Sequence, residues 1–158
     1  MFEGCTSLTS APTLPATELE SYCYCDMFKG CTSLTSAPVL PATALDEATY
    51  CYYGMFEGCT SLTSAPVLPA EIEYAYGCYR GMFKGCTSLT TAPALPSTST
   101  PSSCYDSMFE GCTLLTSAPA LSGTDYIGDF AYSSMFKGCT SLTTAPTLPC
   151  LIVSTYGY

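Results

Sequence analysis

The sequence predicts a repeat solenoid of the right-handed, leucine-rich-repeat type with six coils, and its internal period carries that prediction. The pair Met-Phe occurs six times, beginning at residues 1, 27, 55, 82, 108 and 135. A fixed period of roughly 20–50 residues is typical of solenoids and related arrays, and a period of about 27 lies in the leucine-rich range. Each pair begins nearly the same consensus sequence, Met-Phe-x-Gly-Cys-Thr-Ser-Leu-Thr-Ser-Ala-Pro-x-Leu-Pro. The rest of each repeat varies in length. We therefore predict one solenoid domain over residues 1–158, with coils starting near these positions and no evident capping repeats.

Each coil is predicted to carry a short parallel strand on one face and turns or short helices on the other. The Thr-Ser-Leu-Thr-Ser wording is β-prone, which places a strand near residues 8–11 and at the equivalent positions. The prolines that follow end the strand, because proline has no N–H for the ladder. Residues 23–28 can form a helical turn, which would bring Cys23 and Met27 to one face. Gly30 would end that turn in the left-handed conformation.

The charge and composition exclude several classes of function. The chain has a net charge of −9, four basic residues and no histidine. Four basic residues cannot form a phosphate-binding stripe, so we expect no nucleic-acid partner. No apolar run is long enough to cross a membrane, and no signal peptide is visible at the N-terminus. Without histidine the chain cannot form a Ser-His-Asp catalytic triad, and it has no phosphate-binding loop. We therefore expect neither enzymatic activity nor a cofactor.

Equivalent residues of neighbouring coils should stack about 4.7–4.9 Å apart where strands pair, so each fixed position becomes a column. Two apolar columns are predicted to form the core, since each buried Phe or Leu contributes roughly 1.5–3 kcal/mol. These core ladders are Phe2, Phe28, Phe56, Phe83, Phe109 and Phe136, and Leu8, Leu34, Leu62, Leu89, Leu115 and Leu142.

Ten of the twelve cysteines follow the repeat. One cysteine ladder comprises Cys5, Cys31, Cys59, Cys86, Cys112 and Cys139, and a second column comprises Cys23, Cys51, Cys78 and Cys104. The second column is broken at Ala131, which favours free buried thiols, because thiols packed as small hydrophobes tolerate the loss of a neighbour. Disulfides between adjacent coils stay open as an alternative. No metal site is expected, because there is no histidine and no Cys-x-x-Cys pair. Cys25 and Cys150 lie off the columns and are candidates for special pairing.

A charge ladder alternates in sign along the coils. Its members are Glu3, Lys29, Glu57, Lys84, Glu110 and Lys137. Alternation gives each charge opposite neighbours, although exposed pairs contribute only about 0–1 kcal/mol each. The pattern is explained by simple solubility patterning. It is also explained by head-to-tail stacking, in which Lys137 of one chain meets Glu3 of the next and the contact continues into a filament.

A tyrosine column lies three residues before the methionines. It comprises Tyr24, Tyr52, Tyr79, Tyr105 and Tyr132. We expect it on the convex side, either half-buried with its hydroxyls at the surface or as a stacking platform for sugars or another protein.

The order Phe-x-x-Cys-x-x-Leu, then an apolar residue three later, then Leu-Pro, resembles the BspA-like leucine-rich repeats of bacterial surface proteins. The resemblance implies a curved solenoid displayed outside the cell, adhesion or ligand binding by the repeat surface, and no catalytic residues. Usual repeats of that family are shorter, and the strand-side apolar residue here is alanine. We therefore predict an extracellular or cell-surface module for adhesion or for recognition of a protein or glycan. The alternative is a structural subunit that stacks on itself, head to tail, into a fibril.

Overall fold

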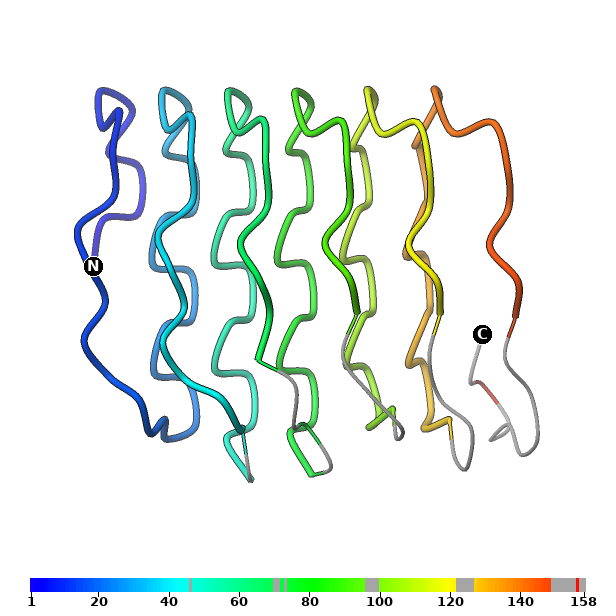
Figure 1. Cartoon of the computed structure of the whole chain (residues 1–158), viewed down its shortest axis with the longest axis horizontal. Coiled ribbons are helices and arrows are strands. Elements are labelled where there is room, and N and C mark those ends of the chain that lie inside the picture. Colours follow the sequence, from blue (N-terminus) through cyan, green and yellow to red (C-terminus); the bar gives the residue numbers. More distant parts are fainter. Residues whose placement is uncertain are drawn as a thin grey trace.

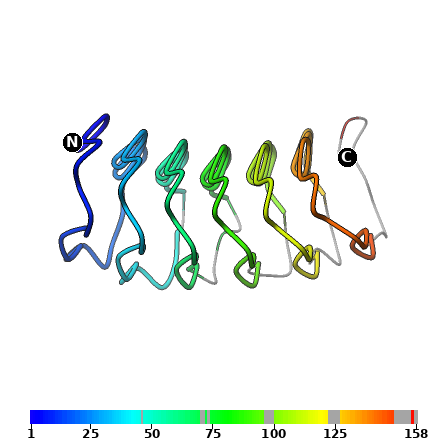
Figure 2. The ribbon, with the colours of Figure 1, turned by 90° about the horizontal axis from the view of Figure 1, so that it is seen from above.

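The structure is a computed structural model that describes residues 1–45, 47–69, 72, 74–95, 100–121, 127–148 and 156. The chain winds into a row of similar coils that follow one another along the long axis, with the N-terminus at one end (Figure 1). Seen from above, the coils lie side by side as a single row (Figure 2). The repeating coil agrees with the predicted repeat fold. The right-handed winding and the lack of capping repeats stay predictions.

The predicted strands are reduced to single bridges between neighbouring coils. Within the described ranges, the chain forms no helix and no strand longer than a bridge. Parallel bridges join Ser36 to Ser64, Ser64 to Thr91, and Thr91 to Ser117. These residues lie inside the Thr-Ser-Leu-Thr-Ser wording, two residues before a proline. Proline has no N–H to donate, so the ladder cannot extend past these bridges.

The dense hydrogen bonding between coils lies on the opposite side, in five stretches that we call the turn segments. They are residues 21–30, 49–58, 76–85, 102–111 and 129–138, each a run of ten consecutive turn residues. In the first four of them, every second N–H donates to a carbonyl of the next coil, as Phe28 does to Met55 at 2.9 Å. The intervening N–H groups donate three residues back within their own coil, as Met27 does to Tyr24 at 3.3 Å. The backbone groups are therefore paired without a helix or a regular sheet.

A left-handed residue occurs at every fourth position of each turn segment. In the second coil these residues are Tyr50, Gly54 and Gly58, with φ between 54° and 72°. Gly30 has a φ of 70°, the left-handed conformation that the sequence predicts for it. The prediction of a helical turn over residues 23–28 is wrong, because Asp26 lies within that stretch with a φ of 51° and interrupts a helical path.

The four-residue turn period decides which side chains enter the core. The two residues after each of the first two left-handed residues point inward, as Cys51 and Tyr52 do after Tyr50, and these pairs are buried in the middle coils. After the third, only the cysteine is buried, as Cys59 is after Gly58, whereas Thr60 is exposed. Cys23 and Met27 share this phase, although Cys23 is exposed at the N-terminal end. The core therefore runs along the axis between the turn segments and the return half of each coil.

Candidate binding surface

The Phe and Leu ladders lie inside the solenoid. Neighbouring Phe rings stack with centroids 5.6–5.9 Å apart and interplanar angles of 2–8°. The inner members of both ladders are fully buried, whereas Phe2, Leu8, Phe136 and Leu142 at the two ends are half-buried. Among the described residues, each of these end residues has a neighbouring coil on one side only. These ladders supply packing and present no surface to a partner.

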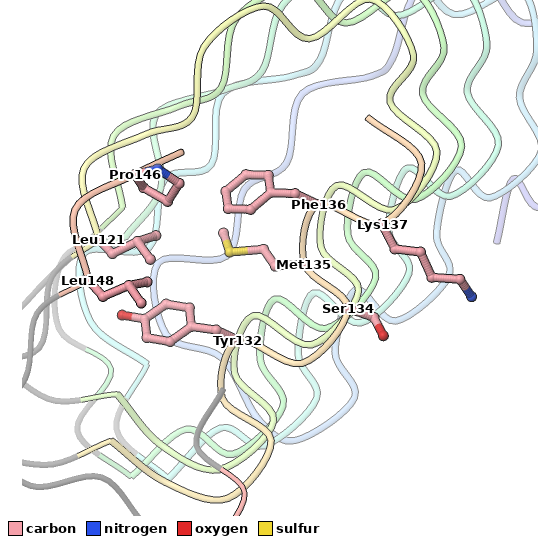
Figure 3. Close-up of a pocket in the computed structure, with 8 residues that line it drawn as sticks. All are labelled: Leu121, Tyr132, Ser134, Met135, Phe136, Lys137, Pro146 and Leu148. Atoms are coloured by element: carbon pink, nitrogen blue, oxygen red, sulfur yellow. The ribbon is translucent and has the colours of Figure 1, made fainter. Parts of the chain in front are cut away.

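The tyrosine column also lies in the core, which corrects both readings of it. Tyr52 and Tyr79 are 0% exposed, and even Tyr24 at the N-terminal side is only 8% exposed. The rings stack on one another at 5.6–5.9 Å, so the inner rings have a neighbour on both faces, whereas Tyr132 borders a cavity that Leu121 and Leu148 also line (Figure 3). The cause is the turn period: each tyrosine lies four residues before a core phenylalanine and shares its inward direction. That spacing was visible in the sequence.

The hydroxyl groups of Tyr79 and Tyr52 differ in their surroundings. The Tyr79 hydroxyl donates to the carbonyl of Pro69 at 3.0 Å, whereas the buried Tyr52 hydroxyl has no partner in the described structure. We expect Tyr79→Phe to lower the free energy of unfolding by about 1–2 kcal/mol, because it leaves a buried carbonyl unpaired. Tyr52→Phe removes an unsatisfied hydroxyl and is expected to be neutral or to stabilise by about 1 kcal/mol. Urea unfolding of the two variants checks the contrast, and equal losses would contradict it.

The cysteine ladder is held by hydrogen bonds to the phenylalanine ladder. Cys59 Sγ–H donates to the carbonyl of Phe28 at 3.1 Å, and the same contact recurs from Cys31 to Cys139 at 3.0–3.1 Å. Burial raises the pKa of Cys59 and Cys112 to about 12, so both remain thiols near neutral pH. A buried thiol with a raised pKa is a weak nucleophile, and these side chains therefore serve packing.

All cysteines in the described part of the chain are free thiols. In the second column, the sulfur atoms of Cys78 and Cys104 approach to 3.3 Å without a bond. Cys25, a candidate for special pairing, donates to Asp26 Oδ2 at 3.6 Å, and burial together with that carboxylate raises its pKa to about 11. Cys150, the other candidate, lies outside the described residues.

The charge ladder lies on the outer face of the turn segments and is paired only in part. Lys29 Nζ lies 2.9 Å from Glu57, and Lys84 and Lys137 lie 2.8 Å and 2.9 Å from Glu110. Across the described residues no ion pair within 4.0 Å joins Glu57 to Lys84 or Glu3 to Lys29. The ladder is therefore interrupted between the turn segments 49–58 and 76–85.

The two lysines beside Glu110 hold the pKa of its carboxyl at about 2, against a usual value of 4.5. Because the pKa is lowered in the folded state, the stabilisation is complete above pH 4.5 and is lost as the pH falls towards 2. We expect Glu110→Gln to lower stability at pH 7 by about 1 kcal/mol, discounted for the exposure of Lys137. The difference between wild type and variant should vanish by pH 2 and shrink in high salt. Urea unfolding at pH 7, 4 and 2 measures it, and a difference that persists at pH 2 would contradict this origin.

An exposed aromatic patch lies on the same outer face, beside the interruption. Tyr22 and Tyr50 stack at 5.3 Å, and Tyr53 meets Tyr50 edge-on at 6.2 Å. The guanidinium of Arg80 lies over the Tyr53 ring, 5.9 Å from its centroid. The ring of Tyr50 occupies the space where a side chain at Gly77 would lie. Sequence reasoning missed this patch, because these tyrosines do not recur in every coil.

The described residues contain no group of three or more His, Cys, Asp or Glu side chains placed to hold a metal ion. They also contain no helix long and apolar enough to span a membrane.

Stacked coils with an apolar interior and a charged outer face define a leucine-rich type of repeat protein. A family model described as the BspA type leucine rich repeat region matches residues 53–149 in six copies. The match covers more than half of the chain, and the chain belongs to this family. The BspA-like family that the repeat motif indicated is therefore confirmed. The six matched copies do not correspond one to one with the coils, because four Met-Phe pairs lie in that range.

One solved structure with a similar fold is a leucine rich cell surface protein from Faecalibacterium prausnitzii A2-165. The TM-score is 0.49 at 20% sequence identity, and the similarity covers 85% of this chain and 31% of that one. The chain thus spans about a third of the length of that protein. No curated protein matches the sequence.

Proposed function

We propose that the chain is a non-catalytic recognition module displayed outside the cell, which binds a protein or glycan through the outer face of the turn segments. Membership of the BspA-type family supports a binding role. One observation carries the choice of face: three of the four basic residues lie there together with a row of tyrosine rings, of which Tyr22 is exposed and Tyr50 and Tyr53 are half-buried. Aromatic and arginine side chains are enriched where proteins bind partners.

The opposite face, formed by the return half of each coil, offers fewer free groups. Its threonine hydroxyls are already engaged, as Thr63 Oγ1 donates to the carbonyl of Thr35 at 3.3 Å and Thr87 to that of Thr60 at 3.4 Å. This face exposes apolar side chains, chiefly Val39 and Val67, which stand at equivalent positions of neighbouring coils beside shallow apolar hollows. The residues that line these hollows carry no charge to orient a polar ligand.

Binding of the protein to arrayed glycans and to host or bacterial surface proteins tests the proposal. A double variant of the outer face, Tyr50→Ser with Arg80→Gln, should lose the captured ligand. A matched double variant of the return face, Val39→Ser with Val67→Ser, should retain it. If only the return-face variant lost binding, the binding site would lie on the return face instead of the outer face. Absence of any ligand on both arrays would count against a recognition role.

The polarity of the hydrogen bonds between coils favours a second candidate function, head-to-tail stacking into a fibril. N–H groups of a turn segment donate to carbonyls of the next coil, as Gly111 does to Lys137, so the same donor-to-acceptor polarity would continue across a head-to-tail contact between two chains. Donors at one end face would meet acceptors at the other, and such a contact does not close on itself. Lys137 of one chain would then lie beside Glu3 of the next.

Negative-stain electron microscopy of the 158-residue chain, with its mass in solution, tests this second function. Filaments that lengthen with concentration, and that Lys137→Glu shortens or abolishes, are the expected result. The matched control is Lys84→Glu, which reverses a charge of the same ladder away from the ends. Discrete particles with the mass of one chain would refute stacking and leave the recognition module.

A further inference from the structure

The interruption of the charge ladder opens a hollow on the outer face. Glu57 turns towards Lys29, and Lys84 turns towards Glu110, so the two neighbouring side chains of the ladder diverge. The space between them has a volume of about 150 Å³. Gly81 forms part of its lining, and a side chain there would meet no atom within 4 Å, so the hollow is open above this residue.

Basic side chains gather at the hollow although the chain as a whole is acidic, and each of them is ion-paired with a carboxylate. Lys29, Arg80 and Lys84 line it, and Glu57 is the one carboxylate among its lining residues. Arg80 Nε lies 3.1 Å from Asp106 Oδ2 in an ion pair, and the Arg80 side chain stays 43% exposed. A guanidinium offers five N–H donors in a planar fork that matches a carboxylate. Lys84 likewise has one ion-pair partner and three donors.

An aromatic wall completes the hollow. Tyr53 lines it directly and also lies under the Arg80 guanidinium, which limits the freedom of both side chains. Tyr50 and Tyr22 extend the wall along the outer face. On the other side, the Ser107 hydroxyl donates to Asp106 Oδ1 at 2.9 Å, and its oxygen keeps its acceptor lone pairs. The site therefore combines fixed cations, a ring face and acceptors for hydroxyl groups, a combination typical of ligand pockets with a few convergent polar groups.

We propose that this hollow binds a carboxylate-bearing sugar unit within an otherwise neutral glycan. The sugar carboxylate lies against Arg80 and Lys84, the apolar face of the sugar ring lies on Tyr53, and Glu57 and Ser107 accept from its hydroxyl groups. A densely charged polyanion fits less well, because Asp106 and Glu110 border the site and the net charge is −9. This inference rests on the proposed recognition function and names its ligand class.

Methyl β-D-glucuronide and methyl β-D-glucoside form a matched pair of probes, because they differ in the carboxylate alone. Titration calorimetry or saturation-transfer NMR should show binding of the glucuronide and at least about tenfold weaker binding of the glucoside, a ratio that corresponds to about 1.4 kcal/mol. Arg80→Gln and Tyr53→Leu should each weaken the glucuronide about tenfold or more. Arg80→Lys, which keeps the charge and loses the fork, should fall between wild type and Arg80→Gln.

Lys137→Gln is the matched control, because Lys137 contacts Glu110 as Lys84 does and lies outside the hollow. Lys84→Gln should weaken the glucuronide and Lys137→Gln should not. The proposal is overturned if both glycosides bind equally, if neither binds, if the two lysine variants behave alike, or if triglutamate binds as well as the glucuronide. Should the outer-face double variant still lose an arrayed ligand while the glucuronide fails to bind, the recognition function stands and the sugar assignment falls.

Discussion

Phe83→Ala is expected to lower the free energy of unfolding by about 3–5 kcal/mol, the usual range for truncating a fully buried phenylalanine. Phe83 is 0% exposed and lies between the rings of Phe56 and Phe109, each with its centroid 5.7 Å away. The substitution removes both ring contacts and leaves a cavity in the middle of the row, where no chain end can collapse to fill it. Urea unfolding followed by tyrosine fluorescence measures the loss.

Two controls separate the causes of that loss. Phe136→Ala removes a half-buried ring with one stacked neighbour, Phe109 at 5.9 Å, and should cost less than half as much. Phe83→Leu keeps most of the volume but removes the ring stack, and should cost about 1.5 kcal/mol or less if packing dominates. Equal losses at Phe83 and Phe136 would show that the ladder does not continue through the molecule.

Gly85→Ala is expected to destabilise the protein by about 1–2 kcal/mol, and the reason is backbone conformation rather than lack of room. Gly85 has a φ of 71°, while an added Cβ would meet the backbone of Gly58 at an ordinary contact distance of 3.7 Å. The Gly85 N–H donates to Glu110 O at 2.7 Å, among the shortest bonds between coils, so the backbone cannot rotate away without losing that bond.

A graded series at Gly85 tests this origin, again by urea unfolding. Asparagine tolerates the left-handed region best among larger residues and β-branched valine tolerates it least. Gly85→Asn should therefore cost less than Gly85→Ala, and Gly85→Val should cost most. If asparagine were as damaging as valine, crowding between coils would be the cause and the stated conformation would play no part.

Much of the coil's organisation could be predicted from the sequence, because a period of about 27 makes residues equivalent whatever their conformation. The Met-Phe pairs identify which side chains stack, as they do for Phe56 and Phe83. Gly30 could be assigned a left-handed conformation, because glycine adopts it without a steric penalty. The family could be assigned because its consensus motif recurs in every coil.

The candidate site could not be predicted, since it depends on where the charge ladder fails to pair. Glu57 has a lysine on each side in the sequence pattern. Only the packed side chains show that it forms an ion pair with Lys29 and not with Lys84. Opposite charges at the surface gain about 0–1 kcal/mol from either choice, so the pattern does not decide between them. The hollow beside Tyr53 and Arg80 follows from that choice.

The sequence by itself determined the repeat, its family and which residues stand in one column. The tertiary structure alone decided that the tyrosine column also faces inward and where the coils are joined. Non-glycine residues such as Tyr50 and Asp26 adopt left-handed conformations because the stacked coils hold them there. The local sequence did not predict these conformations. The resulting four-residue turn period buries Tyr52 and carries the hydrogen bonds on the turn side, because long-range pairing between coils outweighs local preference.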